Sequence, residues 1–111
     1  MAVGDCELAV LIREITSFDP GLRGNAADRV TDRLGSYDPF EVRTLARVLA
    51  TMAAVERATS CRKAQLHAIH ALHIATGLVT GQDIEPLRRI RRDVLEGPER
   101  EYMRTFEEDL L

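Results

Sequence analysis

Apolar side chains recur every three or four residues along most of this chain, which is the spacing that places them on one face of an α-helix. The recurrence runs through residues 5–18, 25–35, 38–56, 60–76, 83–96 and 98–110. No segment shows the alternation of β-branched and polar residues between turn signals that predicts a strand. The pattern therefore predicts an all-α fold of about six helices.

Capping residues, glycine and proline mark the boundaries of these helices. The clearest start is Asp38, with Pro39 at the first helical position and Glu41 three residues after the cap, an arrangement known as a capping box. Residues 18–24 break the first pattern. Further signals are Asp5, Asn25 and Asp83 as N-caps, Thr59 or Ser60 as the cap of the fourth helix, and Gly35 and Gly77 as stops.

Short connections join the expected helices in pairs, which predicts three antiparallel hairpins. Their period is about 40 residues, close to that of HEAT-type repeats, so the hairpins are expected to stack. An irregular helical bundle is the alternative, because the first pair is short and the spacing uneven. A chain of 111 residues with 45% hydrophobic residues can bury one core, so we expect residues 1–111 to form a single domain.

The helix expected over residues 60–76 has two unlike faces. One face carries small and apolar residues and should turn toward the core: Cys61, Ala64, Ala68, Leu72 and Ala75. The other is more apolar than a merely solvated face needs: Leu66, His67, His70, His73 and Ile74, beside Lys63. This helix is therefore expected to have neighbours or a partner on two sides.

Charge and composition narrow the classes of function. The net charge is −3 and 30% of residues are charged, which favours neither a general nucleic-acid binder nor a membrane-surface protein. No apolar run approaches the roughly 18 to 20 residues of a membrane span. The first residues lack the positive start of a signal peptide, so a cytoplasmic address is expected.

The two cysteines, Cys6 and Cys61, stand in no metal-binding or redox spacing. A disulfide between them is one possibility. Because disulfides are rare in the cytosol, we expect free thiols, with Cys61 as a small buried hydrophobe.

Three histidines at residues 67, 70 and 73 are the residues in this chain that most suggest a metal site, because imidazole is a common metal ligand. Neighbours three residues apart share a helical face, but His67 and His73 lie about 120° apart around the helix, so only pairs can converge. We therefore expect these histidines to line a surface or an interface, where they could make partner binding sensitive to pH. No phosphate loop, nucleophile elbow or Cys-x-x-Cys is present, so the chain is expected to have no catalytic activity, cofactor, bound metal or small-molecule ligand.

Two charged segments have alternative interpretations. Four arginines lie between residues 88 and 92 and could contact phosphates, but no aromatic residue stands among them and an acidic helix follows. We expect them to form a solvated face paired with that helix. The acidic residues between 96 and 109 form either an ordinary solvated face or a surface that imitates phosphate, and Glu101, Arg104 and Glu108 are expected to point outward.

The segments 42–49 and 61–72 resemble the second-helix pattern of HEAT repeats, an Arg near the start followed by Ala and Leu at helical steps. The longer run from Ser60 through residues 83–89 to residues 98–102 is similar to the small HEAT-like immunity proteins that accompany secreted polymorphic toxins in bacteria. This resemblance covers about half of the chain and includes no catalytic motif. It implies tight binding to a cognate toxin without chemistry of the chain's own.

A stack of hairpins would align the second helix of each pair on one surface. That surface is predicted to bind a protein partner, with an apolar centre and an acidic rim. We expect a toxin domain as the partner; a helical adaptor without a toxin partner is the second hypothesis, and a DNA-binding regulator the third. The predicted partner-binding residues are Asp28, Asp32, Leu66, His67, His70, Ile74, Glu101 and Glu108.

Overall fold

The computed structural model describes residues 1–111 and contains five α-helices and no strand. The helices are α1 (Asp5–Ile15), α2 (Pro20–Thr31), α3 (Pro39–Val55), α4 (Thr59–Thr76) and α5 (Gly97–Asp109). Three short 3-10 turns accompany them: η1 (Leu34–Ser36), η2 (Glu85–Arg89) and η3 (Arg92–Val94). The all-α class is confirmed, whereas the number of α-helices is five rather than six.

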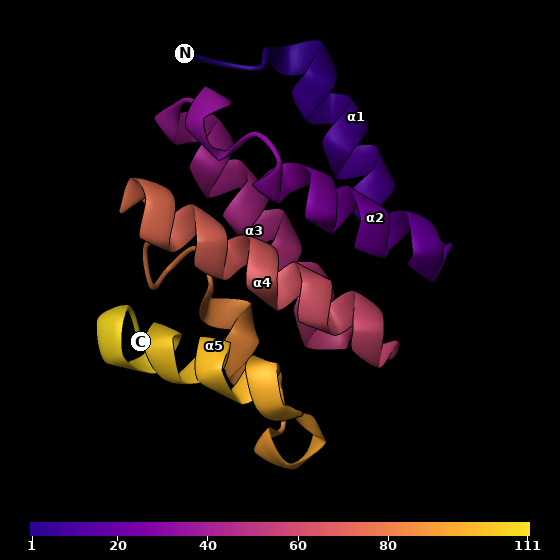
Figure 1. Cartoon of the computed structure of the whole chain (residues 1–111), viewed down its shortest axis with the longest axis vertical. Coiled ribbons are helices and arrows are strands. Elements are labelled where there is room, and N and C mark those ends of the chain that lie inside the picture. Colours follow the sequence, from indigo (N-terminus) through magenta and orange to yellow (C-terminus); the bar gives the residue numbers. More distant parts are fainter.

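Helix α4 crosses the middle of the molecule (Figure 1). Helices α1 and α2 lie above it in that view, α5 lies below it, and α3 lies behind it. It packs against α2, α3 and α5. The prediction that this helix has neighbours on two sides is therefore confirmed.

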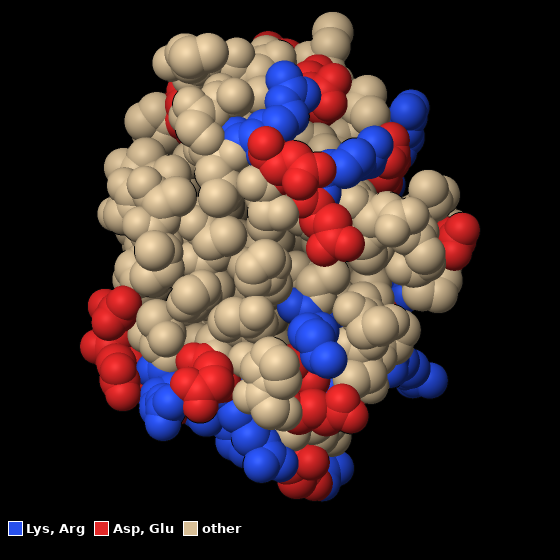
Figure 2. Space-filling model, viewed as in Figure 1, with Lys and Arg blue, Asp and Glu red and all other residues tan.

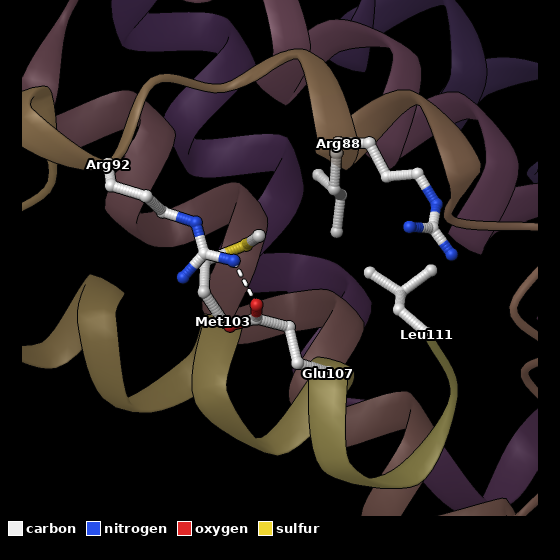
Figure 3. A pocket seen from close by; sticks show the side chains of 6 residues that line it. Arg88, Arg92, Met103, Glu107 and Leu111 are labelled. Carbon is white, nitrogen blue, oxygen red and sulfur yellow. Dashed lines mark hydrogen bonds and ion pairs between the residues drawn. The ribbon is translucent and has the colours of Figure 1, made fainter.

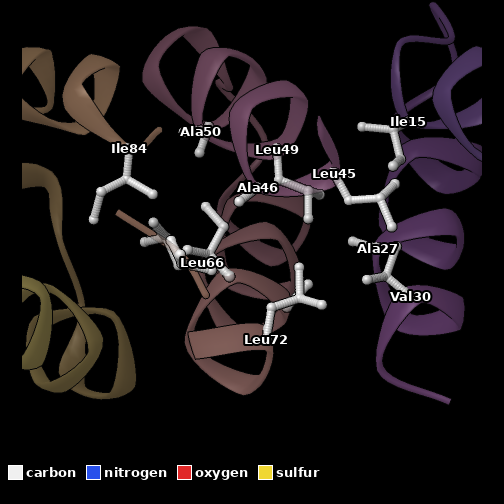
Figure 4. Packing of buried hydrophobic residues seen from close by; sticks show 14 of the residues in the cluster. Ile15, Ala27, Val30, Leu45, Ala46, Leu49, Ala50, Leu66, Leu72 and Ile84 are labelled. Carbon is white, nitrogen blue, oxygen red and sulfur yellow. The ribbon is translucent and has the colours of Figure 1, made fainter. Parts of the chain in front are cut away.

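One hydrophobic core, to which all five helices contribute, includes the junction of α3 and α4 (Figure 4). Alanines at 46, 50 and 53 of α3 and at 68 of α4 are completely or almost completely buried, which lets the two helices approach closely. The capping box of Asp38 and Glu41 starts α3 as predicted, and Gly77 ends α4 in the left-handed conformation with φ 65°. The α3–α4 hairpin is thus the part of the fold that the sequence pattern described best.

Helix α2 begins earlier than predicted. Its N-cap is Asp19, whose carboxylate accepts a hydrogen bond from the backbone N–H of Gly21, and Pro20 occupies the first helical position. Asn25, predicted to be the cap, lies inside the helix. The Asp-Pro pair is the same start signal that precedes α3, but the two glycines that follow it obscure the helical pattern.

The predicted helix over residues 83–96 does not form. The 3-10 turns η2 and η3 replace it, burying Leu87 and Ile90 and leaving Val94 exposed. Asp83 does not cap a helix, because its buried carboxylate is bound by Arg43 and Arg47 of α3. With no α-helix here, the third hairpin is absent and the arrangement is an irregular bundle rather than three stacked hairpins.

The buried face of α4 is rotated from the predicted one. Leu66, predicted to face outward, is fully buried, whereas Ala75, predicted to face inward, is exposed. Figure 4 shows Leu66 beside Ala46 of α3 and near Ile84, which belongs to the segment that folds back after α4. This segment covers a side of α4 that the helical pattern alone left open.

Candidate protein-binding surfaces

The histidines of α4 lie along its junction with α5. The ring centroids of His67 and His70 are 5.7 and 5.1 Å from that of Tyr102, and the His70 ring also lies 6.2 Å from Phe106. His73 Nε2 is 2.8 Å from an oxygen of Asp109. Burial and the neighbouring histidines lower the pKa of His70, which favours its neutral form. These side chains help to dock α5, and no three His, Cys, Asp or Glu side chains lie close enough together to hold a metal ion.

Seven of the eight predicted binding residues are at least partly accessible, and Leu66 is the exception. The structure distributes them over three helices: Asp28 lies on α2 and Asp32 at its C-cap, His67, His70 and Ile74 lie on α4, and Glu101 and Glu108 lie on α5. We refer to these seven residues together as the α4 face. Ile74 exposes 63% of its surface, whereas His70 is half-buried beneath α5. The prediction of Leu66 as a contact residue is wrong, because no partner can reach it without unfolding the core.

The electrostatics of the α4 face differ between its centre and its edges. Lys63 is the only charged residue of α4 that is not buried, so the middle of the face is nearly uncharged. The carboxylates of Asp28, Asp32 and Glu108 form no ion pair, whereas Glu101 pairs with Arg104. Figure 2 shows a broad uncharged area across the middle of this view, with charged side chains gathered over α1 and α2 and along the edge formed by α5.

The arginine-rich segment, residues 88–92, borders a pocket that lies against α5 (Figure 3). Its volume is about 390 Å³, and Leu87, Met103 and Leu111 contribute apolar walls. Arg92 pairs with Glu107, which confirms the predicted pairing of this segment with the last helix. Arg91 pairs with Asp93, just beyond this segment. Arg88 also lines the pocket and forms no ion pair.

A second surface, which was not among the predicted binding residues, lies on the side of α3 that faces away from α4. Phe40 exposes 67% of its surface there and Val55 exposes 68%, while Phe18, in the α1–α2 connection, is fully exposed. We define the α3 face as Phe18, Phe40, Arg43, Thr44, Arg47, Val48, Thr51, Met52, Val55 and Arg57. It carries more exposed large apolar side chains than the α4 face does.

Three hollows follow one another along the α3 face. The first, of about 280 Å³, is lined by Phe40 and Arg47, and the second, of about 260 Å³, is lined by Arg47 and Met52. The third, of about 440 Å³, is lined by Met52, Val55 and Phe18. Each hollow shares a lining residue with the next, so the three lie in a row along α3, and we call this row the furrow.

Buried carboxylates hold the arginines at the edges of this furrow. Asp83 accepts hydrogen bonds from Arg47 at 2.6 Å and from Arg43 at 3.2 Å, and Glu56 accepts two from Arg23, each 2.7 Å long. Burial alone would raise the pKa of both acids, but hydrogen bonds from the guanidinium groups and from neighbouring side-chain and backbone donors together outweigh it and lower each pKa to about 2. Both acids are therefore ionised at neutral pH.

The cysteine beside Glu56 is an inert part of this scaffold. Cys61 donates a hydrogen bond from its thiol to Glu56 over 3.2 Å, and Cys6 is exposed, so both cysteines are free. Burial and the Glu56 carboxylate raise the pKa of Cys61 to about 11. A thiol with so high a pKa is a poor nucleophile.

The exposed residues of α3 could have been found from their position around the helix. The exposed Phe40 and Val55, and Val48, which is partly buried against the core, lie away from the stripe of Val42, Leu45 and Leu49 that the pattern assigned to the core. A second apolar stripe on an amphipathic helix indicates a second contact. Comparison of the chain with protein-family models, with curated proteins and with solved structures gives no match.

Proposed function

We propose that this chain is a cytoplasmic immunity protein that binds a cognate toxin domain through the α4 face and neutralises it by contact alone. The resemblance of residues 60–102 to small helical immunity proteins suggests the class. The absence of a catalytic motif in the sequence is compatible with a protein that acts by binding. None of the five helices combines the length and apolar composition needed to cross a bilayer.

The observation that carries this proposal is that three exposed carboxylates of the α4 face form no ion pair. Asp28, Asp32 and Glu108 form no ion pair, while Glu14 and Glu7 on neighbouring α1 are neutralised by arginines of the α2 region. Unpaired carboxylates around an uncharged centre suit a partner with a basic cleft, because they speed the encounter and occupy sites made for phosphate. Ile74, which is exposed in the last turn of α4, supplies an apolar contact.

The test is co-purification with the protein encoded by the neighbouring gene, followed by titration of the purified pair. We expect Asp28→Lys, Glu108→Lys and Ile74→Asp each to weaken binding by about tenfold or more. A tenfold rise in the dissociation constant corresponds to a loss of about 1.4 kcal/mol of binding free energy. Phe40→Ser, on the α3 face, is the matched control and should bind as the unmodified chain does. Full-strength binding by all three α4-face variants would reject this surface, and failure of the pair to associate would reject the proposal.

A helical adaptor without a toxin partner is the second candidate function. The α3 face favours it, because an inhibitor with one target needs no second exposed apolar surface. If the neighbouring protein does not bind and the α3 face proves functional, the adaptor becomes the better account.

A further inference from the structure

We propose that the α3 face binds an acidic amphipathic helix of a partner protein. This inference concerns a different surface from the α4 face and does not depend on the toxin. It rests on three features of α3: the spacing of its exposed apolar residues, the shape of the furrow and the charge at its edges.

The apolar residues of the α3 face extend along the helix rather than around it. Phe40, Val48 and Val55 are separated by eight and seven residues, which corresponds to two helical turns in each case. At about 1.5 Å per residue, the stripe is roughly 22 Å long. A partner helix of about 15 residues has the same length, and its apolar side chains at every third or fourth position would meet the hollows in series.

The shape of the furrow favours a helix over an extended strand. The chain contains no strand, so it offers no sheet edge to which an extended peptide could add. The backbone hydrogen bonds of α3 are made within the helix. Recognition must therefore come from side chains, and a row of hollows bordered by Phe18, Met52 and Val55 accepts the side chains of one helical face.

The charge of the furrow selects an acidic partner. Arg43 and Arg47 share a single carboxylate, Asp83, so one positive charge of this group is not neutralised. Arg57 is exposed and forms no ion pair. The only acidic residue that lines the hollows is Glu56, which is buried and paired with Arg23. Carboxylates flanking the apolar stripe of a partner helix would meet arginines and no opposing acid.

The experiment uses the whole chain and two synthetic 18-residue peptides. Both have leucines along one helical face; one carries glutamates at the flanking positions and the other carries lysines there. We expect the glutamate peptide to bind saturably in fluorescence anisotropy, and the lysine peptide to bind at least about tenfold more weakly. Amide chemical-shift changes in NMR should centre on α3 and the α1–α2 connection.

Substitutions then identify the surface. Phe40→Ser and Val55→Ser remove exposed apolar side chains and should each weaken binding of the glutamate peptide about fivefold or more. Arg57→Glu, at an arginine with no structural partner, should weaken the glutamate peptide and strengthen the lysine peptide. Ile74→Ser on the α4 face is the matched control and should leave both affinities unchanged.

Several outcomes would overturn the proposal. They are equal affinity for the two peptides, no shift change on α3 at millimolar peptide, and shift changes centred on the α4 face. A concentration-dependent dimer in sedimentation that Val55→Ser dissociates would assign the face to a second copy of the chain. Displacement of the glutamate peptide by a single-stranded oligonucleotide at equal concentration would assign it to nucleic acid.

Discussion

The two flanks of α4 are held by different means. On the α2 side the helices meet through small residues, with Gly24 facing Cys61 and Ala27 fully buried. On the α5 side they meet through rings, with Tyr102 and Phe106 against the histidines of α4. Small residues allow a close backbone approach, whereas rings fill a wider gap, so the two flanks respond differently to changes in volume.

Each flank also contains a buried Arg–Glu pair. Glu56 accepts hydrogen bonds from Arg23 and from three further donors, on Ala58, Cys61 and Gln65. Glu99, which is completely buried, accepts hydrogen bonds only from Arg62 and from the backbone N–H of Glu96. The carboxylate on the α5 side therefore depends on its arginine more heavily than the one on the α2 side does.

Removing the two arginines gives the largest expected effect. Arg62→Met should lower the free energy of unfolding by about 3 to 5 kcal/mol, because Glu99 is left buried with one donor. Arg23→Met should cost about 2 to 3 kcal/mol, since Glu56 retains three donors. Urea unfolding measures both, with Arg91→Met in the exposed pair with Asp93 as a control that should change little. Equal losses for Arg62→Met and Arg23→Met would show that the extra donors of Glu56 are unimportant.

Acid should weaken the contacts of two buried carboxylates, Glu56 and Asp83, over the same pH range. Glu56 and Asp83 have folded pKa values of about 2, below their values near 4 in an unfolded chain, so the unfolded state binds more protons between these limits. The stability they contribute, roughly 2 to 3 kcal/mol each, is fully present above about pH 5 and is lost as the pH falls toward 2. Thermal melts followed by circular dichroism from pH 6 to 2 measure it. Glu56→Gln, less stable at neutral pH, should show a shallower decline, and an unchanged slope would contradict this assignment.

A methyl group added on the α5 side should destabilise the fold. A Cβ at Gly81 would collide with the backbone carbonyl oxygen of Leu110, where the connection after α4 passes the end of α5. Gly81→Ala should therefore cost about 1 to 2 kcal/mol. Differential scanning calorimetry measures the loss, and hydrogen exchange should show it concentrated at the end of α5. Gly35→Ala, with open space around the new Cβ, is the control.

Local signals predicted some boundaries correctly and missed others. The N-caps of α1 and α4 are Gly4 and Ala58 rather than Asp5 and Thr59 or Ser60, and α2 ends at Thr31, before Gly35. The capping box at Asp38, the stop at Gly77 and the apolar spacing of the last helix need only a few neighbouring residues, and all three are present in the structure. The failed helix at residues 83–96 depends on distant contacts. Asp83 is a good N-cap residue by itself, but Arg43 and Arg47, some 40 and 36 residues away, bind its carboxylate instead.

For the candidate surfaces, too, the sequence predicted the exposure of some residues and not of others. Acidic residues such as Asp28 and Glu108 are exposed, as their charge predicts, because burying an unpaired carboxylate is costly. The exposure of apolar residues could not be predicted in this way. Leu66 is covered by a segment that follows α4, whereas Phe40 and Val55 are exposed. Helical periodicity identifies apolar stripes, but only the tertiary packing shows which stripe remains open.

The smallest expected effect has the opposite sign and lies on the α2 side. A Cβ at Gly24 would lie 3.8 Å from the Cα and 3.9 Å from the Sγ of Cys61, which is ordinary van der Waals contact. Alanine also favours a helix interior over glycine, so Gly24→Ala should raise the free energy of unfolding by about 0.5 to 1 kcal/mol. Urea unfolding of Gly24→Ala and Gly81→Ala, measured side by side, tests whether the two flanks of α4 respond oppositely to an added methyl group. A loss of stability in Gly24→Ala would mean that α2 and α4 already approach as closely as their backbones allow, and that the small-residue flank has no space for a methyl group.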